Sequence, residues 1–302
     1  MGDDRDWGHE SPSLRGLNFR FGVRTEDEVL GRRVDAVLAG LRDAGAVEHW
    51  YELTSSPPTA PSVPGTVDVT RDGETIALAQ SPDDALGWLV WDVNRAAAEA
   101  SGGHLLFHAG AVQLTDIGGR EGTGVLLPGA SGSGKSTLSA GLVRAGLGYL
   151  SDELVALDLT SGQLLAYPKP ITVKEGSFPA LRDVGAPEGP ARGDGASGQE
   201  WHLAVGAGAV GRVGEPCVPG FVVVPRYAPG VPTRLEPLSE TRAFLELALN
   251  AVNLIDHGDK ATDAMGALVA GCECAVLTMS DLDEACGLLL EFVGLREAQC
   301  AR

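Results

Sequence analysis

The stretch from Gly129 to Thr137 restricts what this chain can fold into more than any other part of the sequence. It reads Gly-Ala-Ser-Gly-Ser-Gly-Lys-Ser-Thr and fits the pattern G-x-x-x-x-G-K-[ST] of a phosphate-binding loop. The apolar run at residues 125–127 predicts a buried strand, and apolar residues at helical spacing after the loop predict a helix ending near Gly146. This strand, turn and helix order is the context in which the motif binds phosphate, so we expect an α/β fold that binds a nucleoside triphosphate.

The loop residues suit that chemistry individually. Glycines let backbone N–H groups close on a polyphosphate, and the start of the following helix adds its positive end. Lys135 is expected to neutralise the β- and γ-phosphates, and Ser136 to hold Mg²⁺ through its hydroxyl. The alternative is an ordinary turn, in a chain that contains 41 glycines. The predicted nucleotide-binding residues are Gly129, Ser131, Gly132, Ser133, Gly134, Lys135, Ser136 and Thr137.

A pair of acidic residues follows the predicted loop helix. Asp152 and Glu153, after Ser151, interrupt an apolar run that extends from residue 149 to residue 157. Buried carboxylates need partners or a cation, so we expect the pair at the end of a strand beside the loop. One acid would bind Mg²⁺ directly or through water, and the other would accept a proton. The alternative is an exposed acidic turn.

The sequence pattern alone does not decide the role of two other side chains, His108 and Arg226. His108 lies within an apolar strand predicted at residues 105–112, and it is either a hydrogen-bonded core group or a neighbour of the loop. A polar hairpin at residues 116–124 would return the chain from that strand to the loop strand and can bring His108 near the loop, but a single histidine in a strand is usually a hydrogen-bonded core group. Arg226 follows the buried strand predicted at residues 221–224 and could reach a phosphate from the end of that strand.

The lysines form a small set. Lys169 and Lys174 lie in the segment that reads Tyr-Pro-Lys-Pro-Ile-Thr-Val-Lys from residue 167, and the chain has few other lysines. Contact with phosphate or substrate and simple solvation are equally open for both. Residues 185–200 are rich in glycine, proline and alanine, and they predict a mobile loop that could cover a substrate.

The overall charge limits the partners. The formal net charge of -18 over 302 residues repels DNA, RNA and anionic membranes, whereas it suits a basic or neutral peptide. Five cysteines without any C-x-x-C spacing argue against a disulfide framework. The polar start of the chain and the lack of a membrane-length apolar run predict a cytoplasmic protein.

The periodicity predicts two domains. Residues 1–80 read as a small α+β unit, with an unstructured start, a strand at residues 17–23, a helix capped from Thr25, a linker at residues 55–65 and a hairpin at residues 67–78. Ser81 is the predicted cap of the helix that opens the second domain, residues 81–302. In that domain Ser239 and Ser280 are the predicted caps of later helices.

The run from His108 to Val155 resembles the C-terminal kinase domain of HPr kinase/phosphorylase, and more closely the HPr-kinase-related proteins of bacterial peptide-modification gene clusters. In that family a His-Gly strand precedes a G-x-S-G-x-G-K-S loop, and Ala-Asp-Asp follows the loop helix. The corresponding segments here are 108–110, 129–136 and 151–153. Segments 167–174 and 225–227 also match the related group, and the likeness covers roughly residues 80–295. ATP-dependent phosphoenolpyruvate carboxykinase is similar more distantly.

This resemblance implies an α/β P-loop kinase domain of the HPr kinase and phosphoenolpyruvate carboxykinase type, behind a small N-terminal α+β unit. It implies an ATP- and Mg²⁺-dependent serine kinase with Asp152 at the metal and Glu153 as proton acceptor, although the family has a second aspartate at the latter position. It also places His108 in the active site. Beside these residues we expect Lys135 at the phosphates and, from its place at a strand end, Arg226 as a further anion clamp.

The resemblance leaves the acceptor open. A ribosomally made precursor peptide, or another peptide or protein, is the first expectation. A small-metabolite kinase and a nucleotide-binding NTPase or regulatory module are the alternatives. HPr kinase forms rings, so assembly of this chain into a homo-oligomer is an open alternative as well.

Overall fold

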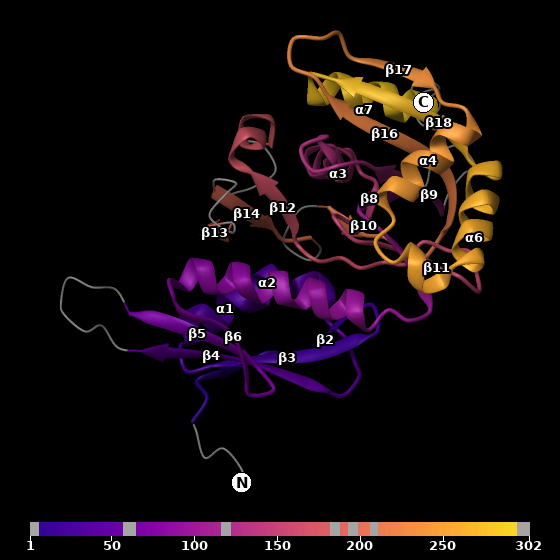
Figure 1. The fold of residues 1–302 in the computed structure, drawn as a ribbon. Helices are drawn as coiled ribbons and strands as arrows, with labels where there is room; N and C mark the ends of the chain where they lie inside the picture. Colours follow the sequence, from indigo (N-terminus) through magenta and orange to yellow (C-terminus); the bar gives the residue numbers. More distant parts are fainter. Residues whose placement is uncertain are drawn as a thin grey trace. The chain divides into compact units, whose positions relative to one another are not determined.

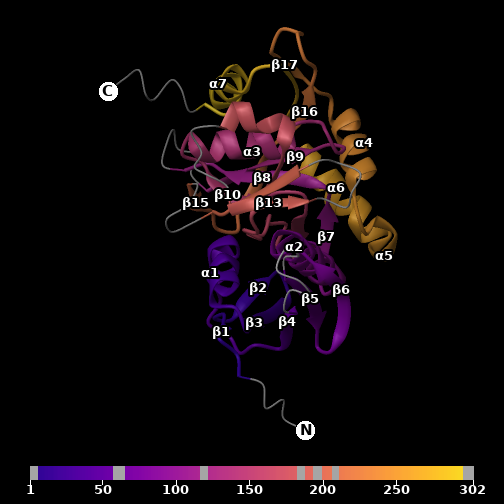
Figure 2. The same cartoon turned by 90° about the vertical axis from the view of Figure 1, so that its left-hand side faces the viewer.

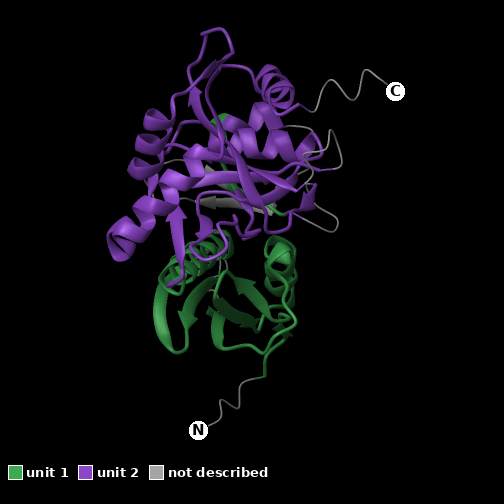
Figure 3. Cartoon of the chain, turned by 90° about the vertical axis from the view of Figure 1, so that its right-hand side faces the viewer, with its two compact units in different colours: residues 1–101, 172–176, 186–204 green, residues 102–171, 177–185, 205–302 purple. Residues whose placement is uncertain are grey.

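The computed structural model describes residues 6–56, 65–115, 122–181, 188–192, 199–205 and 211–294, and it has the mixed α/β composition expected. By its contacts the chain divides into two compact units, which Figure 3 colours separately. Unit 1 contains residues 1–101, 172–176 and 186–204, and unit 2 contains residues 102–171, 177–185 and 205–302. By contacts, the helix that follows residue 80 groups with unit 1. The domain boundary predicted after residue 80 stays a prediction.

Unit 1 is built on a mixed sheet in the order β1–β3–β4–β5–β6, with β2 beside β3. Figure 1 shows α1 and α2 on one face of this sheet. A smaller sheet has the order β12–β14–β13. The elements are β1 (His9–Glu10), β2 (Leu14–Gly16), β3 (Phe19–Thr25), α1 (Glu28–Val37), η1 (Ala39–Leu41), β4 (His49–Ser56), β5 (Thr66–Arg71), β6 (Glu74–Gln80), α2 (Pro82–Glu99), β12 (Ile171–Lys174), β13 (Glu188–Arg192) and β14 (Gln199–Leu203).

Local sequence accounts for most helix starts. Ser81 caps α2 as predicted, because its hydroxyl accepts a hydrogen bond from Asp84 N at 3.1 Å. The cap predicted at Thr25 is wrong, since Asp27 caps α1 and accepts from Val29 N at 2.7 Å. An acidic side chain directly before the first turn reaches those amides more easily than a threonine two residues earlier.

One buried carboxylate ties α2 to the sheet of unit 1. Asp92 is 0% exposed, and Tyr51 and Arg71 of the sheet donate to its Oδ2 at 2.7 and 2.8 Å. Arg95 donates to Oδ1 at 2.7 and 2.9 Å. Both oxygens of the Asp92 carboxylate therefore accept hydrogen bonds, two of the donors being arginines, and a buried charge requires such partners.

We expect Asp92→Ala to lower the free energy of unfolding by about 3–5 kcal/mol, because it leaves Arg71 and the Tyr51 hydroxyl buried without their partner. Urea denaturation of the whole chain measures this. Glu99→Ala is the matched control, since Glu99 also pairs with Arg95 but its side chain is 59% exposed, so a loss below about 1 kcal/mol is expected. Equal losses for the two variants would contradict the argument.

Unit 2 contains a mixed sheet in the order β15–β10–β8–β9–β16–β18–β17 and a separate pair, β11–β7. In β9, β16 and β18 neighbouring strands are parallel. The elements are β7 (His104–Phe107), β8 (Ala109–Gln113), β9 (Thr123–Pro128), α3 (Lys135–Arg144), β10 (Gly148–Ser151), β11 (Val155–Asp158), β15 (Arg212–Val213), β16 (Val218–Tyr227), β17 (Arg234–Pro237), α4 (Glu240–Asn250), α5 (Leu254–His257), α6 (Asp259–Ala270), β18 (Glu273–Met279) and α7 (Leu282–Phe292); η2 (Glu175–Leu181) follows β12.

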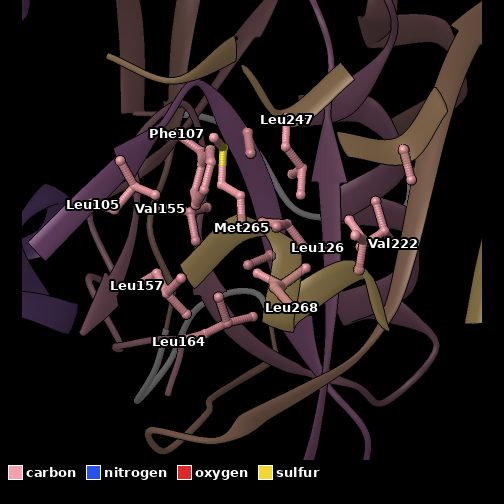
Figure 4. Close-up of a cluster of buried hydrophobic side chains, with 14 of the residues drawn as sticks. Leu105, Phe107, Leu126, Val155, Leu157, Leu164, Val222, Leu247, Met265 and Leu268 are labelled. Carbon is pink, nitrogen blue, oxygen red and sulfur yellow. The ribbon is translucent and has the colours of Figure 1, made fainter. Parts of the chain in front are cut away.

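Helices cover both faces of the larger sheet in unit 2. Figure 2 shows α3 and α7 on one side of β8 and β9, and α4 and α6 on the other. Gly110 of β8 faces α3, where an added Cβ would come within 2.5 Å of Ser139 Oγ. On the opposite face a fully buried cluster includes Phe107, Leu247 and Met265 (Figure 4). Two packed faces explain why these strands read as continuous apolar runs.

The strand predicted at residues 105–112 is wrong as a single element, because it breaks at His108 into β7 and β8, which belong to different sheets. The His108 N–H donates to Asn250 O at 2.7 Å instead of to a neighbouring strand. An unbroken apolar run gives no sign of a change of sheet, since both strands are buried.

Other differences are local. β1 lies within the predicted unstructured start, and β13 and β14 occupy parts of the predicted loop at residues 185–200. Asp281, not Ser280, caps α7, whereas Ser239 caps α4 as predicted. Most of the predicted linker at residues 55–65 and of the hairpin at residues 116–124 lies outside the described residues. None of the helices that the structure describes has the length and apolar character needed to cross a bilayer.

Candidate active site

The predicted phosphate-binding loop connects β9 to α3, in the strand–turn–helix order that the motif requires. Gly132 and Gly134 have φ angles of 82° and 92°, a left-handed conformation that glycine adopts without strain. Gly134 is the N-cap of α3 and provides no side-chain hydrogen bond to the first turn. The N–H groups at the start of α3 are therefore left for an anion to accept from.

The ends of two neighbouring strands support this loop. β16 and β18 run parallel to β9, so their carboxyl ends meet at the same edge of the sheet, where ligands bind in α/β folds. Tyr227 N donates to Ser133 O at 3.0 Å. A Cβ on Gly134 would come within 2.2 Å of Met279 Cε, the end of a flexible side chain of β18, so Met279 would have to move to make room for it.

Lys135 points back into the loop. Its side chain is buried, and Nζ donates to Gly129 O at 2.5 Å and to Ala130 O at 3.0 Å. The same Nζ lies 3.1 Å from His108 Nε2. The structure thus brings the histidine that the sequence left open into direct contact with the loop lysine.

The acidic pair lies close to His108, because the break between β7 and β8 is opposite the break between β10 and β11. β8 pairs with β10, where Ala111 is opposite Ser151, and β7 pairs with β11, where Phe107 is opposite Val155. The residues between these two registers are 108–110 on one segment and 152–154 on the other. The break at the acidic pair was predicted, and the structure sets it directly across from His108.

Asp152 is the inner acid of the pair and is 0% exposed. Burial raises its pKa, whereas the nearby charge of Lys169 and the Ser136 hydroxyl oppose that rise. Neither carboxylate oxygen has a well-formed hydrogen bond to the described residues. Two buried, unsatisfied oxygens beside a loop serine fit the oxygen ligands that Mg²⁺ prefers. No cluster of three or more His, Cys, Asp or Glu side chains that could hold a metal ion occurs in the described part of the chain.

Glu153 is the outer acid, with a side chain that is 50% exposed. Its Oε2 lies 3.4 Å from Nζ of Lys169, which is only 2% exposed. The charge of Lys169 is the main reason that the pKa of Glu153 is lowered, so this carboxylate is ionised at neutral pH. Sequence reasoning left the role of Lys169 open, because a lysine between two prolines is compatible with both contact and solvation.

His108 is held as a neutral imidazole. Burial and the charge of Lys135 lower its pKa below the ordinary value of 6.5, although attraction to Glu153 opposes this. A neutral ring can accept a hydrogen bond from Lys135 Nζ, while its other nitrogen donates. Protonation of the ring would place two positive charges 3.1 Å apart.

This contact predicts a pH dependence of stability. A folded state with a lowered histidine pKa binds fewer protons than the unfolded state, so stability is lost as the pH falls below about 6.5. His108→Gln keeps an acceptor for Lys135 but does not titrate. We expect its free energy of unfolding to fall less than that of the wild type between pH 7 and pH 5.5, and the difference between the two chains to be at most about 1.4 kcal/mol per pH unit. Urea denaturation at both pH values measures this, and equal losses would contradict it.

Two predicted residues make other contacts. Arg226 lies next to the strand end that supports the loop, but its guanidinium donates to Glu246 of α4 at 3.1 Å and its side chain is 58% exposed. Its role as an anion clamp stays a prediction. Thr137 donates from its hydroxyl to Ser177 Oγ at 2.8 Å. The residues that the structure gathers most closely are His108, Lys135, Asp152, Glu153 and Lys169.

No protein-family model matches this chain, and no curated protein matches it either.

Proposed function

We propose that this chain is an ATP- and Mg²⁺-dependent kinase that transfers the γ-phosphate of ATP to a serine hydroxyl of a peptide or protein. The observation that carries the proposal is the junction of the paired strand breaks, which places His108 and the acidic pair beside the lysine of a phosphate-binding loop. Phosphoryl transfer depends on positioning and charge neutralisation, and this cluster offers both.

The residues would divide the work as follows. The backbone N–H groups of residues 132–134 would bind the β-phosphate, for which Ser133 N exchanges its 3.2 Å hydrogen bond to Ala130 O. Lys135 would offset the charge that develops on the transferred group. Glu153 accepts the proton of the serine hydroxyl while the serine oxygen forms a bond to the γ-phosphorus. The bond from that phosphorus to the β,γ-bridging oxygen breaks, and ADP leaves. The proton passes from Glu153 to solvent, and His108 keeps the base and the lysine oriented.

The exposure of the two acids supports this division. A base for a peptide hydroxyl must be reachable from solvent, and Glu153 is half exposed whereas Asp152 is fully buried. Asp152 and Ser136 would instead hold Mg²⁺, which when bound neutralises the negative charge of the triphosphate. The formal net charge of -18 favours a peptide acceptor that is neutral or basic.

A transfer assay with a matched pair of peptides tests the proposal. The chain is incubated with γ-labelled ATP, Mg²⁺ and a lysine-rich peptide that contains one serine, beside the same peptide with alanine in place of serine. We expect label on the serine peptide only. Label that appears solely as inorganic phosphate, with either peptide or with none, would contradict the kinase and favour the NTPase alternative.

A further inference from the structure

We propose that Lys169 is a positioning residue of this site, whose buried ammonium fixes the Glu153 carboxylate in the orientation that proton acceptance requires. The inference deepens the proposed function and rests on it. Lys169 belongs neither to the phosphate-binding loop nor to the acidic segment, and it reaches the site from a separate part of the chain.

The backbone around Lys169 is fixed. Tyr167 N donates to Leu150 O of β10 at 2.8 Å, which ties the segment to the strand that leads into the acidic pair. Lys169 N donates to Tyr167 O at 2.8 Å, and prolines on both sides restrict the φ angles. The side chain therefore leaves from a rigid position next to residues 151–153.

The burial of Lys169 excludes the solvated role. An ammonium that is 2% exposed must have charged or polar partners, because burial of an unpaired charge is strongly unfavourable. Its Nζ lies 3.4 Å from Glu153 Oε2 and donates to Pro170 O at 3.3 Å. Glu153 is therefore the carboxylate that compensates the charge of Lys169.

Glu153 needs such a partner for a second reason. Its φ angle is 74°, a left-handed conformation that a side chain with a Cβ adopts at a cost of about 1–3 kcal/mol. Such a conformation persists only where surrounding contacts enforce it. The side chain is also half exposed, so without Lys169 its carboxylate would be free to change rotamer. The ion pair with a fixed, buried lysine removes that freedom.

The test compares Lys169→Met and Lys169→Arg with Lys260→Met, a control at an exposed lysine of α6. We expect Lys169→Met to lower kcat for peptide phosphorylation by about 100-fold, with KM for ATP and the Kd of ATP within about threefold of wild type. Lys169→Arg keeps the charge, so its kcat should be at least about tenfold higher than that of Lys169→Met. Lys260→Met should behave as wild type. Thermal melting of each variant reports whether it is folded.

The outcomes separate the two proposals. A wild-type kcat in Lys169→Met, or a Lys169→Arg no better than Lys169→Met, overturns the positioning role while the kinase stands. A wild-type chain that binds ATP but phosphorylates no peptide overturns both. If Lys169→Met does not fold, Lys169→Gln replaces it. Lys169→Arg should then exceed Lys169→Gln about tenfold in kcat, and equal values would overturn the inference.

Discussion

Lys135→Ala is expected to lower kcat/KM for phosphoryl transfer by at least about 10³-fold, to the limit of detection. A cation fixed at the transferred phosphate by the protein fold stabilises charge that develops in the transition state, and loss of such a group has effects of this size. In the structure Nζ of Lys135 is held inside the loop by Gly129 O, Ala130 O and His108, so under the proposed function it exchanges one of these contacts for the phosphate. Steady-state transfer to the serine peptide measures the effect.

The same substitution has a second, independent consequence. The charge of Lys135 is one of the causes that lower the pKa of His108, so Lys135→Ala should raise that pKa towards 6.5. An NMR titration of the His108 ring in both chains measures it. Lys260→Ala, at an exposed lysine, should change neither turnover nor the titration. Full turnover in Lys135→Ala would mean that the loop does not contact the reacting phosphate.

The loop and its supporting elements could be predicted because their signals are local. A glycine-rich motif, the apolar run before it and the helical spacing after it lie within one short segment, and β9, the loop and α3 follow that pattern. The break at Asp152 and Glu153 was also visible, since consecutive acids do not occur in a buried strand without a reason.

The neighbourhood of His108 could not be predicted in the same way. Its strand changes sheets within a continuous apolar run, and at the break His108 N donates to Asn250 O, a residue far away in the sequence. Lys169 shows the same limit, because a lysine between prolines is solvated or buried according to what packs on it. Periodicity describes which face of an element is buried and does not identify the partner that covers it.

Glu153→Gln is expected to lower kcat by about 10²–10⁴-fold while ATP binds as in wild type. The amide has nearly the same shape but cannot take the proton of the acceptor hydroxyl. In the wild type, the charge of Lys169 lowers the pKa of Glu153, so the proposed base is ionised at neutral pH. ATP affinity should not change, since the proposed phosphate-binding groups belong to the loop and α3. Turnover of the serine peptide and calorimetric titration with Mg²⁺-ATP measure the two quantities.

Glu284→Gln is the matched control, because Glu284 is an exposed glutamate in the first turn of α7 of the same unit, and it should retain wild-type turnover. Asp152→Asn separates the two acids further. If Asp152 binds the metal, Asp152→Asn should raise the Mg²⁺ concentration that gives half of the maximal rate. If Glu153 is the base, Glu153→Gln should leave that concentration unchanged. If Glu153→Gln instead shifts the Mg²⁺ requirement and keeps the maximal rate, the roles of Asp152 and Glu153 are exchanged.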